Sequence, residues 1–375
     1  MPPTPPPRLL LRGAGRRLRH TGLWLARRLR GPWQALRQGL AWLERRRPAL
    51  PGGTRLWVTL ISFGFLLAAL QSHGRGLLRQ NLDPQGWWWL CLGLGLSLLS
   101  LVVNALGWGV ILRWLGLRPD VEATALLYLS TNLRKYLPGG IWHLAARVRA
   151  LQAPEAPLAE PATTGQALLA VLLDPLLAAI AALALVAPAD LQEGSWGRAL
   201  LWLLPLLLLL PRWLTPLLLR LERQRARQLA RPGEEPTLVV PPARVPLLPL
   251  LALLLFVLLR FSGFASCVLA FDLQGSLEWS RWLAGFALAW TVGLVVPGAP
   301  GGLGVFEATL LLSLGGLVPE GPLLAVALSY RVVATAADLL AAATAAADQR
   351  WRIRVTGAGK VPLSGHDGEV PSTSP

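Results

Sequence analysis

The fold is decided by a proline- and glycine-rich stretch inside strongly apolar sequence, residues 295–307, which read VVPGAPGGLGVFE. A weaker echo lies far upstream at residues 135–140, which read KYLPGG. A bilayer tolerates backbone broken in this way only where it is buried in protein or lines a wet cavity. Two such breaks, about half a chain apart, are typical of transporters built from two similar halves.

The composition of the whole chain indicates a membrane protein. Of its 375 residues 53% are hydrophobic and only 15% are charged, and the mean hydropathy is +0.48. This is too little charge for an ordinary soluble domain, and apolar runs long enough to cross a hydrocarbon core of ~30 Å recur along the chain. Cys91 and Cys267 lie in apolar segments and have neither metal-ligand spacing nor a disulfide pattern. We therefore expect an all-α polytopic membrane protein.

Eight hydrophobic segments follow one another along the chain. They lie at 55–72, 87–112, 123–145, 163–187, 199–219, 245–271, 282–318 and 323–347. The N-terminal arm, the loop 220–244 and the tail are rich in arginine, so the positive-inside rule places all three in the cytoplasm. The three basic regions can all be cytoplasmic only if the segment 123–145 enters the membrane from the cytoplasm and returns to it. The segment 282–318 must likewise be a hairpin, which enters from the outside and returns there. The prediction is six full spans and two re-entrant hairpins, arranged as an inverted repeat with both termini cytoplasmic.

Three regions differ in composition: a basic arm (1–54), a transmembrane domain (55–350) and a tail expected to be disordered (351–375). The first 50 residues hold twelve arginines and one acid, Glu44, with leucines at helical spacing. Basic amphipathic helices of this kind lie on anionic membrane surfaces, and a solvated basic tail is the alternative. Anionic lipid headgroups are thus the expected partner, in preference to nucleic acid.

Ionisable residues within apolar segments are candidates for function because each is costly in lipid. They are Arg134, Lys135, His143, Asp174, Arg260, Glu307, Arg331 and Asp338. Beside the backbone of Pro138, Gly139 and Gly140, the first two would suit a phosphate or carboxylate. Alternatively, both snorkel to the cytoplasmic interface. The histidine could be a partner of theirs or a hydrogen-bonded structural residue.

The second break has a clearer local reading. Pro297 and Pro300 end the incoming helix, and the glycines permit a tight turn, at positions Gly301, Gly302 and Gly304. Glu307 then falls in the first turn of the returning helix, where it can cap free N–H groups, contact substrate, or do both.

The remaining charges predict a polar network in the interior. Asp174 precedes Pro175, whose ring should disrupt the local helix. Arg331 and Asp338 are seven residues apart and so share one helix face. We expect a buried network of Asp174, Arg260 and Asp338 with these neighbours, while the alternative is that the charges only hold helices together.

Enzymatic chemistry is not indicated. The sequence holds no P-loop, metal-ligand cluster or nucleophile elbow. Its longest predicted loop, 220–244, is too short for a catalytic domain of ~100 residues. We expect no enzyme, no cofactor and no metal.

The motifs resemble those of the lysylphosphatidylglycerol synthase transmembrane-region family. The stretch Pro297-x-x-Pro300-Gly301-Gly302-x-Gly304-x-x-Glu307 is similar to the C-terminal signature of that family. Ser329-Tyr330-Arg331 resembles the start of its last span. Lys135-x-x-Pro138-Gly139-Gly140 resembles its upstream signature. The resemblance covers about residues 55–350. In the bacterial multiple peptide resistance factors, such a region flips aminoacylated phosphatidylglycerol, and a soluble aminoacyl-transferase domain follows it. No such domain is expected here, so the resemblance does not imply synthase activity.

The resemblance implies a lipid flippase of the bacterial inner membrane that acts on a phospholipid or related lipid. A secondary transporter for a small anion and a non-transporting scaffold or assembly factor stay open as alternatives. The sequence also leaves open whether the protein forms a homo-oligomer.

Overall fold

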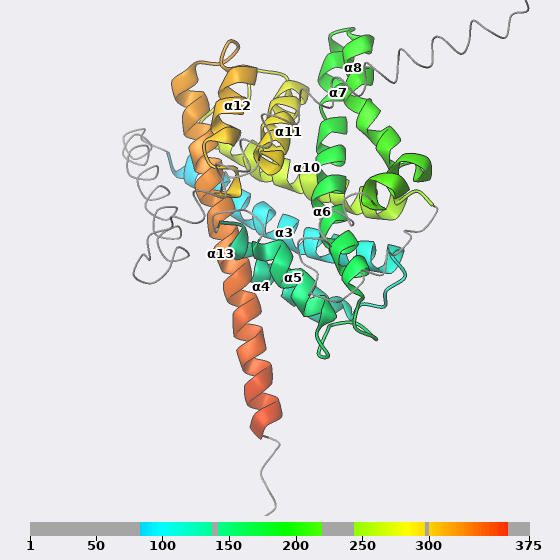
Figure 1. Cartoon of the computed structure of the whole chain (residues 1–375). Coiled ribbons are helices and arrows are strands. Elements are labelled where there is room, and N and C mark those ends of the chain that lie inside the picture. Colours follow the sequence, from blue (N-terminus) through cyan, green and yellow to red (C-terminus); the bar gives the residue numbers. More distant parts are fainter. Residues whose placement is uncertain (1–82, 137–141, 220–243, 297–299, 359–375) are drawn as a thin grey trace, which may run out of the picture. The chain divides into compact units, whose positions relative to one another are not determined.

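The computed structural model describes residues 83–136, 142–219, 244–296 and 300–358. All of them belong to one compact unit, Val58–Pro375. These residues form helices and no strand, with one isolated β-bridge between Pro119 and Leu158 (Figure 1). The all-α class is therefore confirmed for the described part of the chain. The arm 1–54, the segment 55–72 and nearly all of the loop 220–244 lie outside it.

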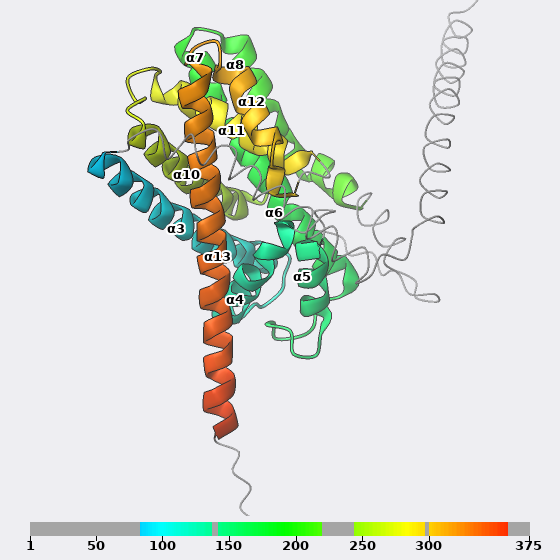
Figure 2. The same cartoon turned by 90° about the vertical axis from the view of Figure 1, so that its left-hand side faces the viewer.

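The helices fall into two series along the chain. The first comprises α3 (Pro84–Trp114), α4 (Val121–Asn132), the 3-10 helix η1 (Leu133–Tyr136), α5 (Trp142–Gln152), α6 (Thr164–Ala184), α7 (Ala187–Gln192), α8 (Trp196–Leu203) and the 3-10 helix η2 (Leu204–Leu209). The second comprises α10 (Leu247–Ala270), α11 (Trp279–Val295), the 3-10 helix η3 (Pro300–Gly302), α12 (Val305–Leu314) and α13 (Glu320–Ala358). The last helix runs past residue 350 into the predicted tail 351–375 (Figure 2).

Polar caps fix where several of these apolar helices begin. The Asp83 carboxylate accepts from the N–H of Gly86 at 2.6 Å, and Asp120 accepts from Ala123 at 2.7 Å. Thr163 opens α6 with a reciprocal capping box. Such side chains satisfy N–H groups that no helical carbonyl can reach.

Four described helical stretches are long and apolar enough to cross a membrane: Pro84–Trp114, Thr164–Gln192, Leu247–Ala270 and Glu320–Asp348. The predicted full span 199–219 is instead a pair of helices, Trp196–Leu209 and Pro211–Leu219, bent by 67°. Counted as one broken span, this pair makes a fifth. Pro205 and Pro211 explain the bend, since proline removes a helical donor and fixes φ. The count of eight segments and the inverted repeat stay predictions.

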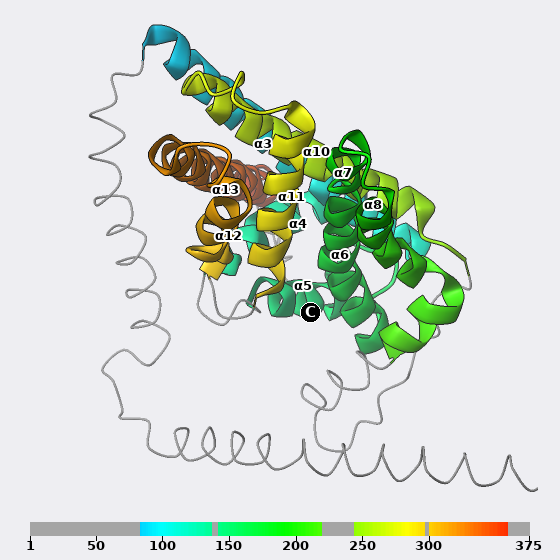
Figure 3. The same cartoon turned by 90° about the horizontal axis from the view of Figure 1, so that it is seen from above.

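Both predicted hairpins are interrupted helix pairs. In the first, α4 and α5 hold 12 and 11 residues, well short of the ~20 that a span needs, and the second member continues to Gln152 rather than ending at 145. In the second, α11 and α12 pack against each other across the break (Figure 3). The side from which each pair enters the membrane stays a prediction.

Small residues bring α3 and α10 close together, and the two helices lie side by side (Figures 1 and 3). A Cβ on Gly93 would lie 3.1 Å from the carbonyl oxygen of Gly263 and 3.2 Å from Cβ of Ser266. Close helix contact through such residues is common in membrane proteins. The helices α4, α6 and α13 pack against this α3–α10 pair.

Candidate functional site

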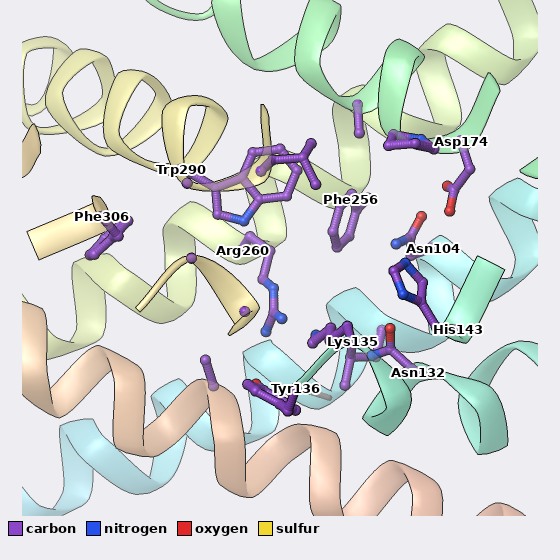
Figure 4. Close-up of a pocket in the computed structure, with 18 of the residues that line it drawn as sticks. Asn104, Asn132, Lys135, Tyr136, His143, Asp174, Phe256, Arg260, Trp290 and Phe306 are labelled. Atoms are coloured by element: carbon purple, nitrogen blue, oxygen red, sulfur yellow. The ribbon is translucent and has the colours of Figure 1, made fainter. Parts of the chain in front are cut away.

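A cavity of about 340 Å³ lies where the two broken hairpins meet α6, α10 and α13 (Figure 4). Its polar lining comprises Asn104, Tyr128, Asn132, Lys135, Tyr136, His143, Arg147, Asp174, Arg260, Tyr330 and Arg331. Apolar side chains complete the wall, including Phe256, Trp290 and Phe306. A cavity with this many charged groups inside membrane-length helices is the candidate site.

The carboxylate of Asp338, on α13, is the centre of the first cluster and is 1% exposed. Its Oδ1 accepts from Asn132 Nδ2 at 2.8 Å, and its Oδ2 accepts from the Tyr136 hydroxyl at 2.5 Å. Lys135 Nζ is 2.8 Å from the same Oδ2, whereas Arg260 Nη2 is 3.9 Å from Oδ1. Residues 132–136 are therefore tied to a helix about 200 positions later in the chain.

Asp174 forms a second cluster with Arg147 of α5. The Arg147 Nη1 donates to Asp174 Oδ2 at 3.3 Å, and the Tyr128 hydroxyl donates to the same oxygen at 2.8 Å. The guanidinium also lies 3.5 Å from the Tyr128 ring centroid, a cation–π contact. Asn104 Nδ2 donates to the Tyr128 oxygen at 2.7 Å. The helix α6 continues through Pro175, so this proline does not end it.

Arg331 joins α13 to the second break. Its Nε donates to Glu307 Oε1 at 2.8 Å, and its two Nη groups donate to the carbonyls of Gly301 and Gly302 at 2.7 and 2.5 Å. Gly301 has φ +60° and Gly302 has φ +72°, a backbone that glycine adopts without strain. No side chain caps α12. Glu307 therefore meets Arg331 and does not serve as the predicted cap.

The two sequence breaks meet at this cavity. A Cβ on Gly301 would lie 2.6 Å from Cε1 of Tyr136, so the tyrosine ring packs directly on the glycine. On its other side the second break packs on α11, where a Cβ on Gly302 would lie 2.9 Å from the Gly293 carbonyl oxygen. The conformation of each break thus depends on its contacts with distant parts of the chain.

The predicted cationic pair is divided. Lys135 points to the buried carboxylate, whereas Arg134 is exposed and does not line the cavity. His143 does line it, with a buried Nδ1 that has no hydrogen-bond partner in the described part of the chain. Gly304, which has φ +78°, lies immediately before α12. Pro138, Gly139 and Gly140 lie outside the described residues, as does Pro297.

The structure divides the predicted charge network into three centres, on Asp338, Asp174 and Glu307. Sequence reasoning missed the groups that complete the first two, namely Asn104, Tyr128, Asn132, Tyr136 and Arg147. The arginine follows His143 by four positions, which places both on one helix face and was a usable signal. The described residues include no group of three His, Cys, Asp or Glu that could hold a metal ion.

Comparison with known proteins yields one family. The description of that family is lysylphosphatidylglycerol synthase TM region, and its match covers residues 55–342. This range contains both breaks and every charged group that lines the cavity. No curated protein matches the chain.

Proposed function

Since the chain belongs to the lysylphosphatidylglycerol synthase TM region family, we propose that this multi-pass membrane protein transfers a phospholipid or related lipid between the leaflets of a bilayer. We place it in the bacterial plasma membrane with both termini in the cytoplasm, as the arginine distribution favours. In this role it binds and moves its substrate and does no covalent chemistry.

One observation carries the proposal: the cavity combines a charged interior with an apolar rim. Lys135, Arg260 and Arg331 line the interior. Leu294 and Val295, at the end of α11, line the same cavity and are 40% and 65% exposed. A lipid presents a matching pair of surfaces, because its headgroup is ionic and its acyl chains are apolar. A small soluble anion would need no apolar rim.

The polar groups of the site also suit a substrate that must leave again. Asp338 already has three partners that can stay bonded to it while a headgroup contacts their cavity-facing sides. Arg331 donates to the carbonyls of Gly301 and Gly302 in the second break, so these two groups stay hydrogen-bonded where the helix is interrupted at the cavity. Broken helices at the binding site are typical of membrane transporters.

A non-transporting scaffold is the second candidate, and a specific observation favours it. Each of the carboxylates of Asp174, Glu307 and Asp338 has a cationic partner within 3.3 Å, as expected of charges that only hold helices together. This candidate requires that neutralising the cations causes misfolding and no selective loss of transfer.

The decisive experiment is transfer of fluorescent lipids with different headgroups in proteoliposomes. The substitutions Lys135→Met and Arg331→Met each remove a positive charge. Each should lower the rate of lipid transfer at least about tenfold, since a charge-assisted hydrogen bond contributes roughly 1.5–3 kcal/mol. The exposed Arg212→Gln is the matched control and should transfer as the wild type does. Wild-type rates of lipid transfer in both variants, each shown to be folded, would contradict the proposal. Uptake of soluble anions without lipid transfer would identify a small-anion transporter.

A further inference from the structure

Arg260 is a buried cation without an adequate partner. It lies near the middle of α10 and is 5% exposed. Its Nε and Nη1 are buried and have no hydrogen-bond partner among the residues that the structure describes. Its one ion-pair contact in that part of the chain, Nη2 to Asp338 Oδ1 at 3.9 Å, is too long for a hydrogen bond.

The neighbouring carboxylate of Asp338 does not hydrogen-bond this guanidinium in the structure. Both oxygens of Asp338 already accept from other groups, at 2.8 Å from Asn132, 2.5 Å from Tyr136 and 2.8 Å from Lys135. A buried charged group is normally both paired and hydrogen-bonded. This arginine therefore has donors left over for a ligand.

The described charges around the cavity also leave one cation in excess. Four cations line it, Lys135, Arg147, Arg260 and Arg331. Three acids pair with them, Asp174, Asp338 and Glu307. Lys135, Arg147 and Arg331 each lie within 3.3 Å of a carboxylate, so the excess positive charge falls on the fourth, Arg260. An anionic ligand would neutralise it.

We propose that Arg260 is the anion-binding residue of the cavity and takes a phosphate-type oxyanion through its unpaired N–H groups. Arginine suits this role because its donors are fixed in a plane and its charge is permanent. Figure 4 shows the side chain reaching from α10 toward Lys135 and Tyr136, so the anion would lie beside the Asp338 cluster. The identification of the anion as a lipid headgroup rests on the proposed function, whereas anion binding itself does not.

The proposal predicts two effects of opposite sign for Arg260→Gln. Without an anion, the variant should melt at least about 2 °C higher than the wild type in a non-ionic detergent, because it removes an unsatisfied buried charge. Its affinity for the anion should fall at least about tenfold. Arg212→Gln, which removes an exposed guanidinium, should change neither quantity.

The binding test uses the full chain and two probes, inorganic phosphate and phosphatidylglycerol, with the zwitterionic phosphatidylcholine as the reference of zero net charge. The readout is the saturable rise in melting temperature with probe concentration. A rise with either anionic probe that Arg260→Gln loses supports the proposal. Response to phosphatidylglycerol alone identifies a lipid headgroup, and response to inorganic phosphate alone identifies a free anion. No rise in the wild type, or an equal rise in Arg260→Gln, overturns it.

Two further results keep the test decisive. If Arg260→Gln does not fold, Arg260→Lys decides, because it keeps the charge but lacks the Nε and Nη donors; unchanged affinity in that variant overturns the proposal. Lipid transfer is measured separately in proteoliposomes. Arg260-dependent binding without transfer would support the anion site and contradict the flippase. Transfer without any Arg260-dependent binding would support the flippase and overturn the anion site.

Discussion

Asp338 is the residue on which most polar contacts of the cavity depend. It is fully buried, and Lys135 and Arg260 have no other carboxylate partner in the described chain. Asp338→Asn should lower the free energy of unfolding by about 3–5 kcal/mol, because it leaves the buried Arg260 and the partly buried Lys135 without a counter-charge. Denaturation in mixed micelles would measure this loss.

The control for that substitution is Asp272→Asn. Asp272 is exposed and has φ +53°, a conformation that asparagine also adopts, so the change should be within about 0.5 kcal/mol. Adding Arg260→Gln to Asp338→Asn should recover part of the lost stability, since it removes one of the two cations that have lost their counter-charge. Equal losses for both aspartates would contradict the central role of Asp338.

Single charges were the part of the site that the sequence revealed best. Lys135, Arg331 and Asp338 stood out because charge is rare in apolar sequence. Arg134 and Lys135 were treated as a pair, but residues 133–136 form a 3-10 helix in which neighbours point about 120° apart, so only Lys135 lines the cavity. Tyr128 was not singled out, since an uncharged polar side chain is ordinary in a membrane helix and only the fold brings it to Asp174.

At the scale of helices, close approach depends on small residues at the α3–α10 contact. Gly93→Leu should lower the free energy of unfolding by about 1–3 kcal/mol, because the new side chain would meet the carbonyl oxygen of Gly263 and the side chain of Ser266. Gly95→Leu, in the same helix, has nothing within 4 Å of its Cβ and should lose no stability. Thermal unfolding of both variants checks this. An equal loss at both positions would show that helix composition, and not this contact, sets stability.

Element boundaries were predictable where hydropathy alone decides them. The boundaries of the predicted segments 87–112 and 245–271 agree to within three residues with those of α3 and α10, respectively. The bend within 199–219 was overlooked because its prolines sit in an unbroken apolar run, which a hydropathy pattern counts as one span. The end of α5 was missed for the opposite reason: Arg147 and Arg149 look like loop residues, yet the first is buried against Tyr128 and Asp174.

At the scale of the whole molecule, the two breaks recognised in the sequence converge on one cavity. The sequence predicted each break from its prolines and glycines, but not their contact. That contact depends on how α13 packs, since its Asp338 holds Tyr136 and its Arg331 holds the carbonyls of Gly301 and Gly302. No local pattern encodes such a juxtaposition. The contact predicts that substitutions in the two breaks are energetically coupled.

A double-mutant cycle tests the coupling between the breaks. Gly301→Ala should be more destabilising than the positive φ alone requires, because the new methyl group would meet the Tyr136 ring. In a Tyr136→Ala background the excess should vanish, giving a coupling energy of about 1 kcal/mol or more in unfolding experiments. Gly304→Ala is the matched control: it has φ +78° but nothing within 4 Å of its Cβ, so its loss of about 1–2 kcal/mol should be the same in both backgrounds. Additivity at Gly301 as well would mean that the two breaks do not touch in the folded protein, and the cavity as described would have to be abandoned.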